Sequence, residues 1–329
     1  MAEVFDIFNP QISKVISGLG GKIITIYGIS GTGKTYQCSR MSKPLFLCFE
    51  EGLNAIGGKK VLPVHTWADF IKYNNQLTGK STVEKAREMY DTIICDSIDA
   101  MENICLEYIC GQNGVRTIGD IPHGAGYKLY ETTFWKEVNK ITKAGYTIVF
   151  IGHPQQDING FISIKGDQKR TVDPIIARSD ITAYLQNNGV GEDGKPLHSS
   201  AWLCQTADFF ARSRFTEIIP YIEDFTAENL EKAIIEAIEK EGQISGKENI
   251  MGFDEYAAMT KVEKKTFDQL MEELNEVGMK IAQANKMEDL TYIVESHLGA
   301  GGKVSELKRG SEATMEVILM ELQELAATL

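Results

Sequence analysis

The clearest chemical signal in the sequence is a glycine-rich segment that ends in a lysine and a threonine. It matches the phosphate-binding pattern G-x-x-x-x-G-K-[ST] at every position. Glycines in such a loop let backbone N–H groups converge on phosphate oxygens, the lysine reaches the β- and γ-phosphates, and the threonine hydroxyl binds Mg²⁺. The sequence therefore predicts a site for ATP and Mg²⁺ made by Gly28, Ile29, Ser30, Gly31, Thr32, Gly33, Lys34 and Thr35.

An acidic residue at the end of a later apolar run could complete this site. Asp96 closes the run that starts at Thr92, and a strand ending in aspartate downstream of a phosphate-binding loop is the Walker B pattern. Because the carboxylate of that pattern holds Mg²⁺, Thr35 and Asp96 are the predicted metal-binding residues. Asp91 and Asp99 lie nearby and are interpreted as solvated or capping residues.

These side chains need strands and helices that hold them at one edge of a sheet. Apolar runs of strand length alternate with stretches of helical spacing through the first half of the chain. This alternation predicts an α/β fold with a mostly parallel central sheet and helices on both faces. An amphipathic helix is also expected over residues 12–19. The predicted buried strands are residues 23–27, 45–49, 60–64, 92–95 and 146–151.

The pattern changes in the second half of the chain. Short strand-like runs are followed by a helix over 227–239 and a polar, glycine-marked stretch over 242–252. We therefore predict an ATPase core over residues 1–242 and an acidic helical module over residues 253–329. Apolar residues recur at helical spacing in that module. They fit a bundle that packs on itself, or a docking surface for a single-strand-binding protein or another protomer.

Composition and charge exclude several classes of protein. The 329 residues are 43% hydrophobic and 24% charged, which is typical of a folded globular protein. The net charge of −12 leaves no broad basic face for strong independent nucleic-acid binding. No apolar run approaches the ~20 residues that span a bilayer, and the N-terminus lacks the basic region of a secretory signal. Six scattered cysteines without a CxxC pair indicate free thiols. We expect a cytoplasmic protein, in the host cytoplasm if it is phage-encoded, that does not bind membranes.

The order of these motifs resembles that of RecA-like ATPases. Within that group, residues 18–240 are similar to the phage nucleotide-binding family that includes the fourth type of Sak single-strand annealing protein. The resemblance implies a RecA-like P-loop NTPase that hydrolyses ATP in DNA recombination or single-strand annealing; the C-terminal module lies outside it. The similarity rests on 26–35 (IYGISGTGKT), 47–53 (LCFEEGL), 92–97 (TIICDS), 124–127 (GAGY), 149–153 (VFIGH) and 210–215 (FARSRF).

The resemblance also implies catalytic roles for residues at strand ends. Glu50 aligns with the glutamate that activates the attacking water, and Glu51 is the alternative. A carboxylate at the carboxyl end of a strand, beside the γ-phosphate, can orient a water molecule. His153 occupies the position of a polar γ-phosphate sensor, where RecA recombinases have glutamine. A histidine after a buried strand could equally be a structural cap.

Two arginines align with basic residues that reach a neighbouring subunit's γ-phosphate in several RecA-like families. This chain has Arg212 and Arg214 where a lysine and an arginine are usual, which keeps the charge and adds a planar donor group. Such residues would make hydrolysis depend on assembly into a homo-oligomer. Surface ion pairs with Glu217 or Asp208 are the alternative explanation.

A basic segment after His153 corresponds to the DNA-binding loop of RecA-like proteins. Its charged residues are Lys165, Lys169 and Arg170, although three cations in one loop could also form a solvated turn. The main hypothesis is therefore an ATPase stimulated by single-stranded DNA. A helicase-loader or motor-type DNA ATPase is one alternative, and a nucleotide-dependent scaffold with little turnover is another.

Overall fold

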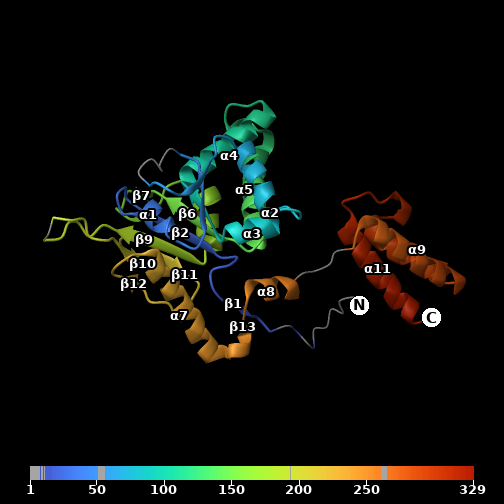
Figure 1. Ribbon diagram of the computed structural model, residues 1–329. Coiled ribbons are helices and arrows are strands. Elements are labelled where there is room, and N and C mark those ends of the chain that lie inside the picture. The colour runs from blue at the N-terminus through green and yellow to red at the C-terminus, as the bar shows by residue number, and fades with distance from the viewer. Residues whose placement is uncertain (1–7, 9, 11, 51–55, 193, 261–264) are drawn as a thin grey trace. The chain divides into compact units, whose positions relative to one another are not determined.

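The structure, a computed structural model, describes residues 8, 10, 12–50, 56–192, 194–260 and 265–329. Two compact units divide the chain, Met1–Met259 and Thr260–Leu329. The larger unit has three layers, with helices on both sides of a central sheet (Figure 1). None of the described helices is both long enough and apolar enough to cross a membrane.

Thirteen strands occur in the described part of the chain, and nine of them form the central sheet. They are β1 (Val15–Ile16), β2 (Ile23–Gly28), β3 (Pro44–Cys48), β4 (Lys60–Pro63), β5 (Thr92–Asp96), β6 (Thr147–Gly152), β7 (Pro154–Gln156), β8 (Ile162–Ile164), β9 (Ile181–Gln186), β10 (Ser200–Trp202), β11 (Arg212–Ser213), β12 (Tyr221–Ile222) and β13 (Ile250–Met251). The five strands predicted between residues 23 and 151 correspond to β2 to β6.

The central sheet is mixed, although its middle is parallel. The strand order is β12-β10-β9-β2-β6-β5-β3-β4, and β11 also pairs with β9. The six strands from β9 to β4 run parallel, whereas β10, β11 and β12 make antiparallel pairs beyond β9. Every strand of the predicted nucleotide site lies in the parallel part.

Helices cover both faces of this sheet (Figure 1). Residues of α2, α4, α5 and α6 share one hydrophobic core with the sheet, and residues of α1 and α7 share the core on the other face. Fully buried aromatic residues such as Trp67 and Phe134 each contribute roughly 1.5–3 kcal/mol or more by leaving water. The helices of this unit are α1 (Lys34–Cys38), α2 (Trp67–Thr78), α3 (Val83–Met89), α4 (Ile98–Asn113), α5 (Ala125–Lys143), α6 (Asp173–Arg178), α7 (Ala227–Ser245) and α8 (Phe253–Met259), with helical turns η1 (Ile118–Asp120), η2 (Pro122–Gly124), η3 (Gln168–Val172) and η4 (Lys247–Asn249).

The N-terminal lead-in is a strand, and the helix predicted over residues 12–19 is wrong. Val15 and Ile16 form β1, which pairs in parallel with β13. Val15 packs against the core on the α7 side of the sheet. Both residues are β-branched, and such residues pack well on a pleated surface. The spacing of apolar residues fitted a helix, but the pairing with β13 could not be seen in the local sequence.

The boundary between the units also differs from the predicted one. Residues 253–259 were assigned to the C-terminal module, yet α8 belongs to the larger unit. The Phe253 ring occupies the space left by Gly21 and Gly145, where an added Cβ would lie 2.5 Å and 2.7 Å from ring atoms. Arg87 also forms an ion pair with Asp254, with Nη1 and Oδ1 2.7 Å apart. These contacts tie α8 to the ATPase core.

The smaller unit is a helical bundle. Its elements are α9 (Phe267–Gln283), α10 (Met287–Leu298), the turn η5 (Val304–Glu306) and α11 (Glu312–Ala327). The apolar stripes predicted on α9 and α11 meet in one core, which buries Leu270, Leu274, Ile281, Met315, Ile318, Leu319 and Leu322. Of the two interpretations of these stripes, the structure favours a module that packs on itself.

Candidate nucleotide-binding site

The glycine-rich loop lies between the fully buried strand β2 and helix α1. Gly31 and Gly33 have φ angles of 85° and 76°, in the left-handed region that glycine adopts readily. Gly28 is needed for packing, because an added Cβ would lie 2.7 Å from the Leu185 carbonyl oxygen of β9. The backbone of the loop therefore has the turn that a phosphate-binding loop requires.

Lys34 folds back onto this loop. Its Nζ donates hydrogen bonds to the carbonyl oxygens of Gly28, at 2.7 Å, and Ile29, at 2.9 Å. The side chain is buried, and burial lowers the pKa of Lys34, while the nearby Asp96 carboxylate opposes this shift. A lysine held inside the loop is in place to exchange these carbonyl acceptors for the oxygens of a nucleotide phosphate.

Thr35 and Asp96 meet as predicted for a metal-binding pair. Thr35 Oγ1 donates to Asp96 Oδ2 at 3.0 Å. Burial raises the pKa of Asp96 to about 6, and the Thr35 hydrogen bond opposes this rise. A buried carboxylate beside a hydroxyl is an oxygen donor set that suits Mg²⁺, and a cation would offset the cost of burying the negative charge. The two residues thus fit the ion, which would supply positive charge to the β- and γ-phosphates.

The strand order brings two further predicted residues to the same edge. Strand β6 lies between β2 and β5, so His153, which follows β6, lies between the phosphate-binding loop and Asp96. Glu50 follows β3, the neighbour of β5. Because these strands are parallel, their carboxyl ends share one edge, which is the usual ligand-binding edge of such sheets.

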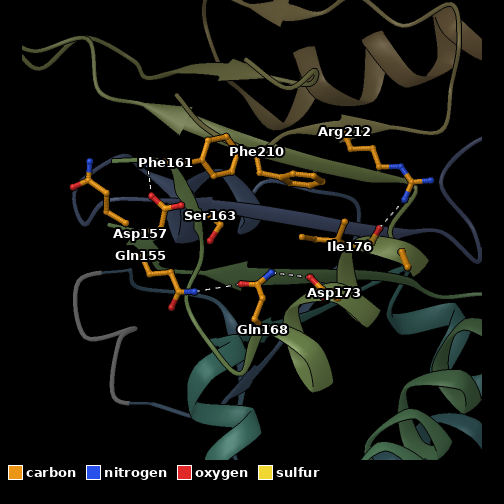
Figure 2. A pocket seen from close by; sticks show the side chains of 11 residues that line it. Gln155, Asp157, Phe161, Ser163, Gln168, Asp173, Ile176, Phe210 and Arg212 are labelled. Atoms are coloured by element: carbon orange, nitrogen blue, oxygen red, sulfur yellow. Dashed lines mark hydrogen bonds between the residues drawn. The ribbon is translucent and has the colours of Figure 1, made fainter. Parts of the chain in front are cut away.

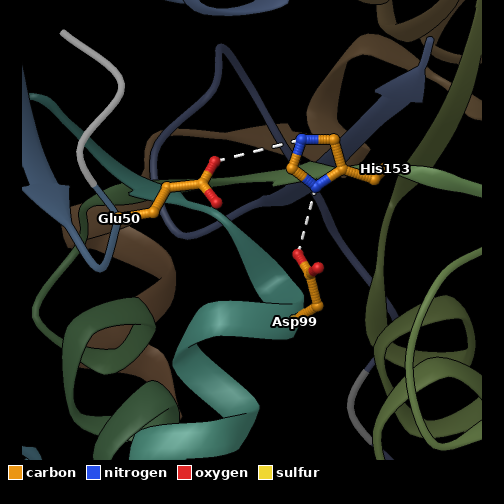
Figure 3. Close-up of side chains that lie close together, drawn as sticks. All are labelled: Glu50, Asp99 and His153. Carbon is orange, nitrogen blue, oxygen red and sulfur yellow. Dashed lines mark hydrogen bonds and ion pairs between the residues drawn. The ribbon is translucent and has the colours of Figure 1, made fainter. Parts of the chain in front are cut away.

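His153 joins two acidic residues from different elements (Figure 3). Its Nε2 lies 3.9 Å from Glu50 Oε1, and its Nδ1 lies 3.2 Å from Asp99 Oδ1. The Glu50 side chain is 38% exposed, so its carboxylate is open to solvent. Glu51, the alternative base, lies outside the described residues.

Asp99 is the residue that the sequence interpretation missed. It was assigned a solvated or capping role, but its side chain is only 17% exposed and contacts His153, Lys165 and Ser97. Burial raises the pKa of Asp99, yet the hydrogen bonds from Lys165, Ser97 and His153 outweigh it and hold the pKa well below its usual range. Its position three residues after Asp96, in the first turn of α4, was the only available signal.

The group of Glu50, Asp99 and His153 could in principle bind a cation, since their ligand atoms lie within 4.8 Å of one another. However, Lys165 Nζ lies 2.8 Å from Asp99 Oδ2. A lysine at this distance already supplies the positive charge that the carboxylate attracts. We therefore interpret Asp99, His153 and Lys165 as a hydrogen-bonded network beside Glu50 rather than as part of a metal centre.

The three basic residues of the predicted DNA-binding segment have different surroundings. Lys165 belongs to the network around His153, as just described. Arg170 pairs with Asp167, with 2.7 Å between Nη1 and Oδ2, and its guanidinium lies 3.4 Å from the centroid of the Tyr127 ring. Lys169 is exposed on η3. Lys165 and Lys169 therefore present their charge to solvent more directly than Arg170 does.

Arg212 and Arg214 lie away from the phosphate-binding loop of their own chain. In β11, Arg212 is opposite Thr182 of β9, and Thr182 is level with Thr25, three residues before the loop. Arg212 Nη1 donates to the Ile176 carbonyl oxygen at 3.3 Å, and Arg214 donates to that of Ala177.

The alternative explanation for these arginines named the wrong acidic partners. Among the described residues, Arg214 pairs with Asp180, with 3.7 Å between Nη1 and Oδ1, rather than with Glu217 or Asp208. Their carbonyl partners belong to the last turn of α6, where a cation is favourable because the carbonyl groups there lack helical partners. A helix-capping role is thus the structural alternative to a catalytic one.

Comparison with known proteins fits this geometry. A protein family described as "AAA domain" matches residues 21–215, more than half of the 329-residue chain. The chain belongs to the AAA domain family. The match covers the phosphate-binding loop, Asp96, His153 and the arginines. This AAA domain is therefore a P-loop ATPase-like α/β domain, and membership implies nucleotide binding with a divalent metal, generally Mg²⁺.

A relative of this AAA domain protein shares its whole length. The chain is 48% identical over 323 residues to the SPbeta prophage-derived uncharacterized protein YorG of Bacillus subtilis (strain 168), which covers 98% of this chain and 99% of that protein. The similarity therefore includes the C-terminal helical unit as well as the AAA domain.

Proposed function

We propose that this protein is a RecA-like, phage-type ATPase that acts as a homo-oligomer on single-stranded DNA, in recombination or annealing, as the fourth type of Sak protein does. The main support is that Thr35 contacts Asp96 at the sheet edge where His153 also lies, directly before a hairpin that is followed by Lys165. In this proposal Glu50 orients the attacking water and His153 contacts the γ-phosphate. The prophage origin of the similar protein YorG also supports it.

A pocket beside the β7–β8 hairpin is suited to unpaired nucleic acid (Figure 2). Its volume is about 560 Å³, and its lining includes Phe161 and Phe210, which offer apolar ring surface for a base. The two acids of the lining already accept hydrogen bonds within the protein, Asp157 from backbone N–H groups and Asp173 from Gln168. The side chains of Gln155, Gln156, Gln168 and Arg212 also line the pocket, and each donates one hydrogen bond within the protein.

Replacing Phe161 with alanine should weaken the binding of single-stranded DNA by about 5- to 150-fold. Stacking of a base on an aromatic side chain is worth ~1–3 kcal/mol, and alanine removes the ring. Fluorescence anisotropy with a labelled oligonucleotide measures the change at a fixed salt concentration. Phe161→Tyr is the matched control, because it keeps the ring. Equal loss in both variants would indicate that the pocket does not bind bases.

The positions of Arg212 and Arg214 allow the proposed homo-oligomer to be tested. Because Arg212 and Arg214 lie away from their own phosphate-binding loop, a role at a γ-phosphate would require the site of a neighbouring protomer. An arginine supplied in this way can contribute ~10³-fold or more to turnover.

Arg212→Ala and Arg214→Ala should therefore reduce ATP hydrolysis while leaving ATP affinity intact. Mixing either variant with Lys34→Ala protomers should restore part of the activity, since the Lys34→Ala protomer donates an intact arginine to a neighbour with an intact loop. Turnover is measured against the fraction of each subunit. Arg178→Ala is the control for lost packing in α6, because Arg178 contacts Trp135 instead. If mixed oligomers form and no activity returns, the arginines cap α6 and do not act in trans.

The proposal as a whole is tested by ATP turnover with and without single-stranded DNA, measured together with the oligomeric state. Stimulation supports a DNA-dependent ATPase, and its absence favours the scaffold alternative. Strand-annealing and duplex-unwinding assays then separate an annealing protein from a helicase loader or motor.

A further inference from the structure

Asp99 is shared between the nucleotide site and the surface hairpin. One carboxylate oxygen, Oδ1, contacts His153 Nδ1 at 3.2 Å, and the other, Oδ2, contacts Lys165 Nζ at 2.8 Å. The Lys165 side chain is 57% exposed, whereas that of Asp99 is 17% exposed. Asp99 therefore connects the exposed Lys165 to His153, the residue that we propose contacts the γ-phosphate.

Hydrogen bonds from the backbone N–H groups of Lys165 and Asp167 hold the segment that carries Lys165 next to His153 and helix α4. Lys165 N–H donates to the His153 carbonyl oxygen at 2.8 Å, so the two residues are neighbours in the chain reversal. One helical turn after Asp99, the buried Glu102 accepts from Asp167 N–H, at 3.2 Å to Oε1 and 3.1 Å to Oε2. Helix α4, which begins just after Asp96, thus fixes the segment that carries Lys165.

The charge on Asp99 determines how strongly it can hold His153. An ionised carboxylate only accepts hydrogen bonds, so His153 donates from Nδ1 and its Nε2 faces Glu50. A hydrogen bond to a carboxylate stabilises the positive charge of an imidazole ring, which could in turn stabilise charge on a phosphate in the transition state. Lys165 neutralises part of the Asp99 charge and so weakens this effect.

We propose that Asp99 is the positioning residue for His153, and that Lys165 restrains the site by competing for the same carboxylate. A nucleic-acid phosphate that binds Lys165 withdraws it from Asp99, which leaves the carboxylate charge to His153 and to the Ser97 hydroxyl, 2.7 Å from Oδ1, and activates hydrolysis. This inference rests on the proposed function, because it names the contact through which single-stranded DNA reaches the ATPase site.

Lys165→Gln should raise ATP turnover without DNA by about tenfold or more, the scale of one hydrogen bond to a charged group. The ratio of DNA-stimulated to unstimulated turnover should fall toward one. Lys165→Arg keeps the charge and should retain stimulation by DNA. Lys72→Gln, which breaks a surface pair with Asp69, should change neither rate. Asp99→Asn should lower kcat with and without DNA and leave KM for ATP nearly unchanged. If Lys165→Gln only weakens DNA affinity and leaves the unstimulated rate as it was, Lys165 is a plain DNA contact and the inference is wrong.

A second measurement does not depend on turnover. Long-range ¹H–¹⁵N spectra of the five histidines should show His153 carrying its proton on Nδ1 in the wild type, with the signal assigned by its loss in His153→Gln. Asp99→Asn should change this protonation pattern. An unchanged His153 signal in Asp99→Asn contradicts the inference, whether or not the protein hydrolyses ATP. Conversely, a wild type that DNA does not stimulate, together with a faster Lys165→Gln, contradicts the proposed DNA function while Asp99 keeps its positioning role.

Discussion

Lys34→Ala should abolish measurable ATP hydrolysis, with a loss of at least about 100-fold. That figure is the cost of removing one preorganised donor of transition-state charge. The structure makes the expectation sharper, since Lys34 Nζ is already held inside the loop by the carbonyl oxygens of Gly28 and Ile29. Alanine removes both the cation and these loop contacts. ATP affinity by calorimetry and turnover by phosphate release are the two measurements.

The same substitution could also disturb the fold, because Lys34 is buried with 7% of its surface exposed. Lys22→Ala is a matched control: Lys22 is 6% exposed and its Nζ donates to the Ile16 carbonyl oxygen at 2.8 Å, away from the loop. Both variants should lose some thermal stability, and only Lys34→Ala should lose nucleotide affinity. Near-normal affinity and turnover in Lys34→Ala would rule out the phosphate-binding role of this loop.

Glu50→Gln should leave ATP binding intact and reduce hydrolysis by about 10²–10⁴-fold, the contribution of a general base. The amide has the size of the carboxylate but cannot take a proton from water. A rapid-quench measurement with bound ATP separates the chemical step from binding. The neighbouring Glu51→Gln variant is the natural control. If Glu51→Gln loses hydrolysis and Glu50→Gln does not, the catalytic assignment is off by one residue.

His153 supplies an internal check on this assignment. Its Nε2 lies 3.9 Å from Glu50 Oε1, so a base at Glu50 would act beside the imidazole. Under the proposal, His153→Gln should retain part of the activity, because glutamine can also donate a hydrogen bond to a phosphate oxygen.

The local sequence pattern predicts those strands correctly that have apolar surroundings on both faces. Strands β2, β3, β5 and β6 are buried on both faces, so an apolar run was a sufficient signal. The helix predicted over residues 12–19 is wrong because the structure of this segment depends on a distant partner. The pairing of β1 with β13 joins segments more than 230 residues apart. The predicted domain boundary is wrong for the same reason. Helix α8 belongs to the larger unit because its Phe253 ring packs against Gly21 and Gly145, which are distant in sequence.

Residue types and spacing alone were enough to predict a phosphate-binding loop and to single out Asp96. Their chemistry depends on one short segment and one strand end, and the contact between Thr35 and Asp96 follows once the strands are parallel. The contacts of Asp99 and the surroundings of Arg212 could be seen only in the folded chain. A carboxylate near the start of a helix looks the same in sequence whether it caps that helix or holds a histidine 54 residues away. Which of these occurs depends on the strand order, which inserts β6 between β2 and β5 and thereby sets His153 against Asp99.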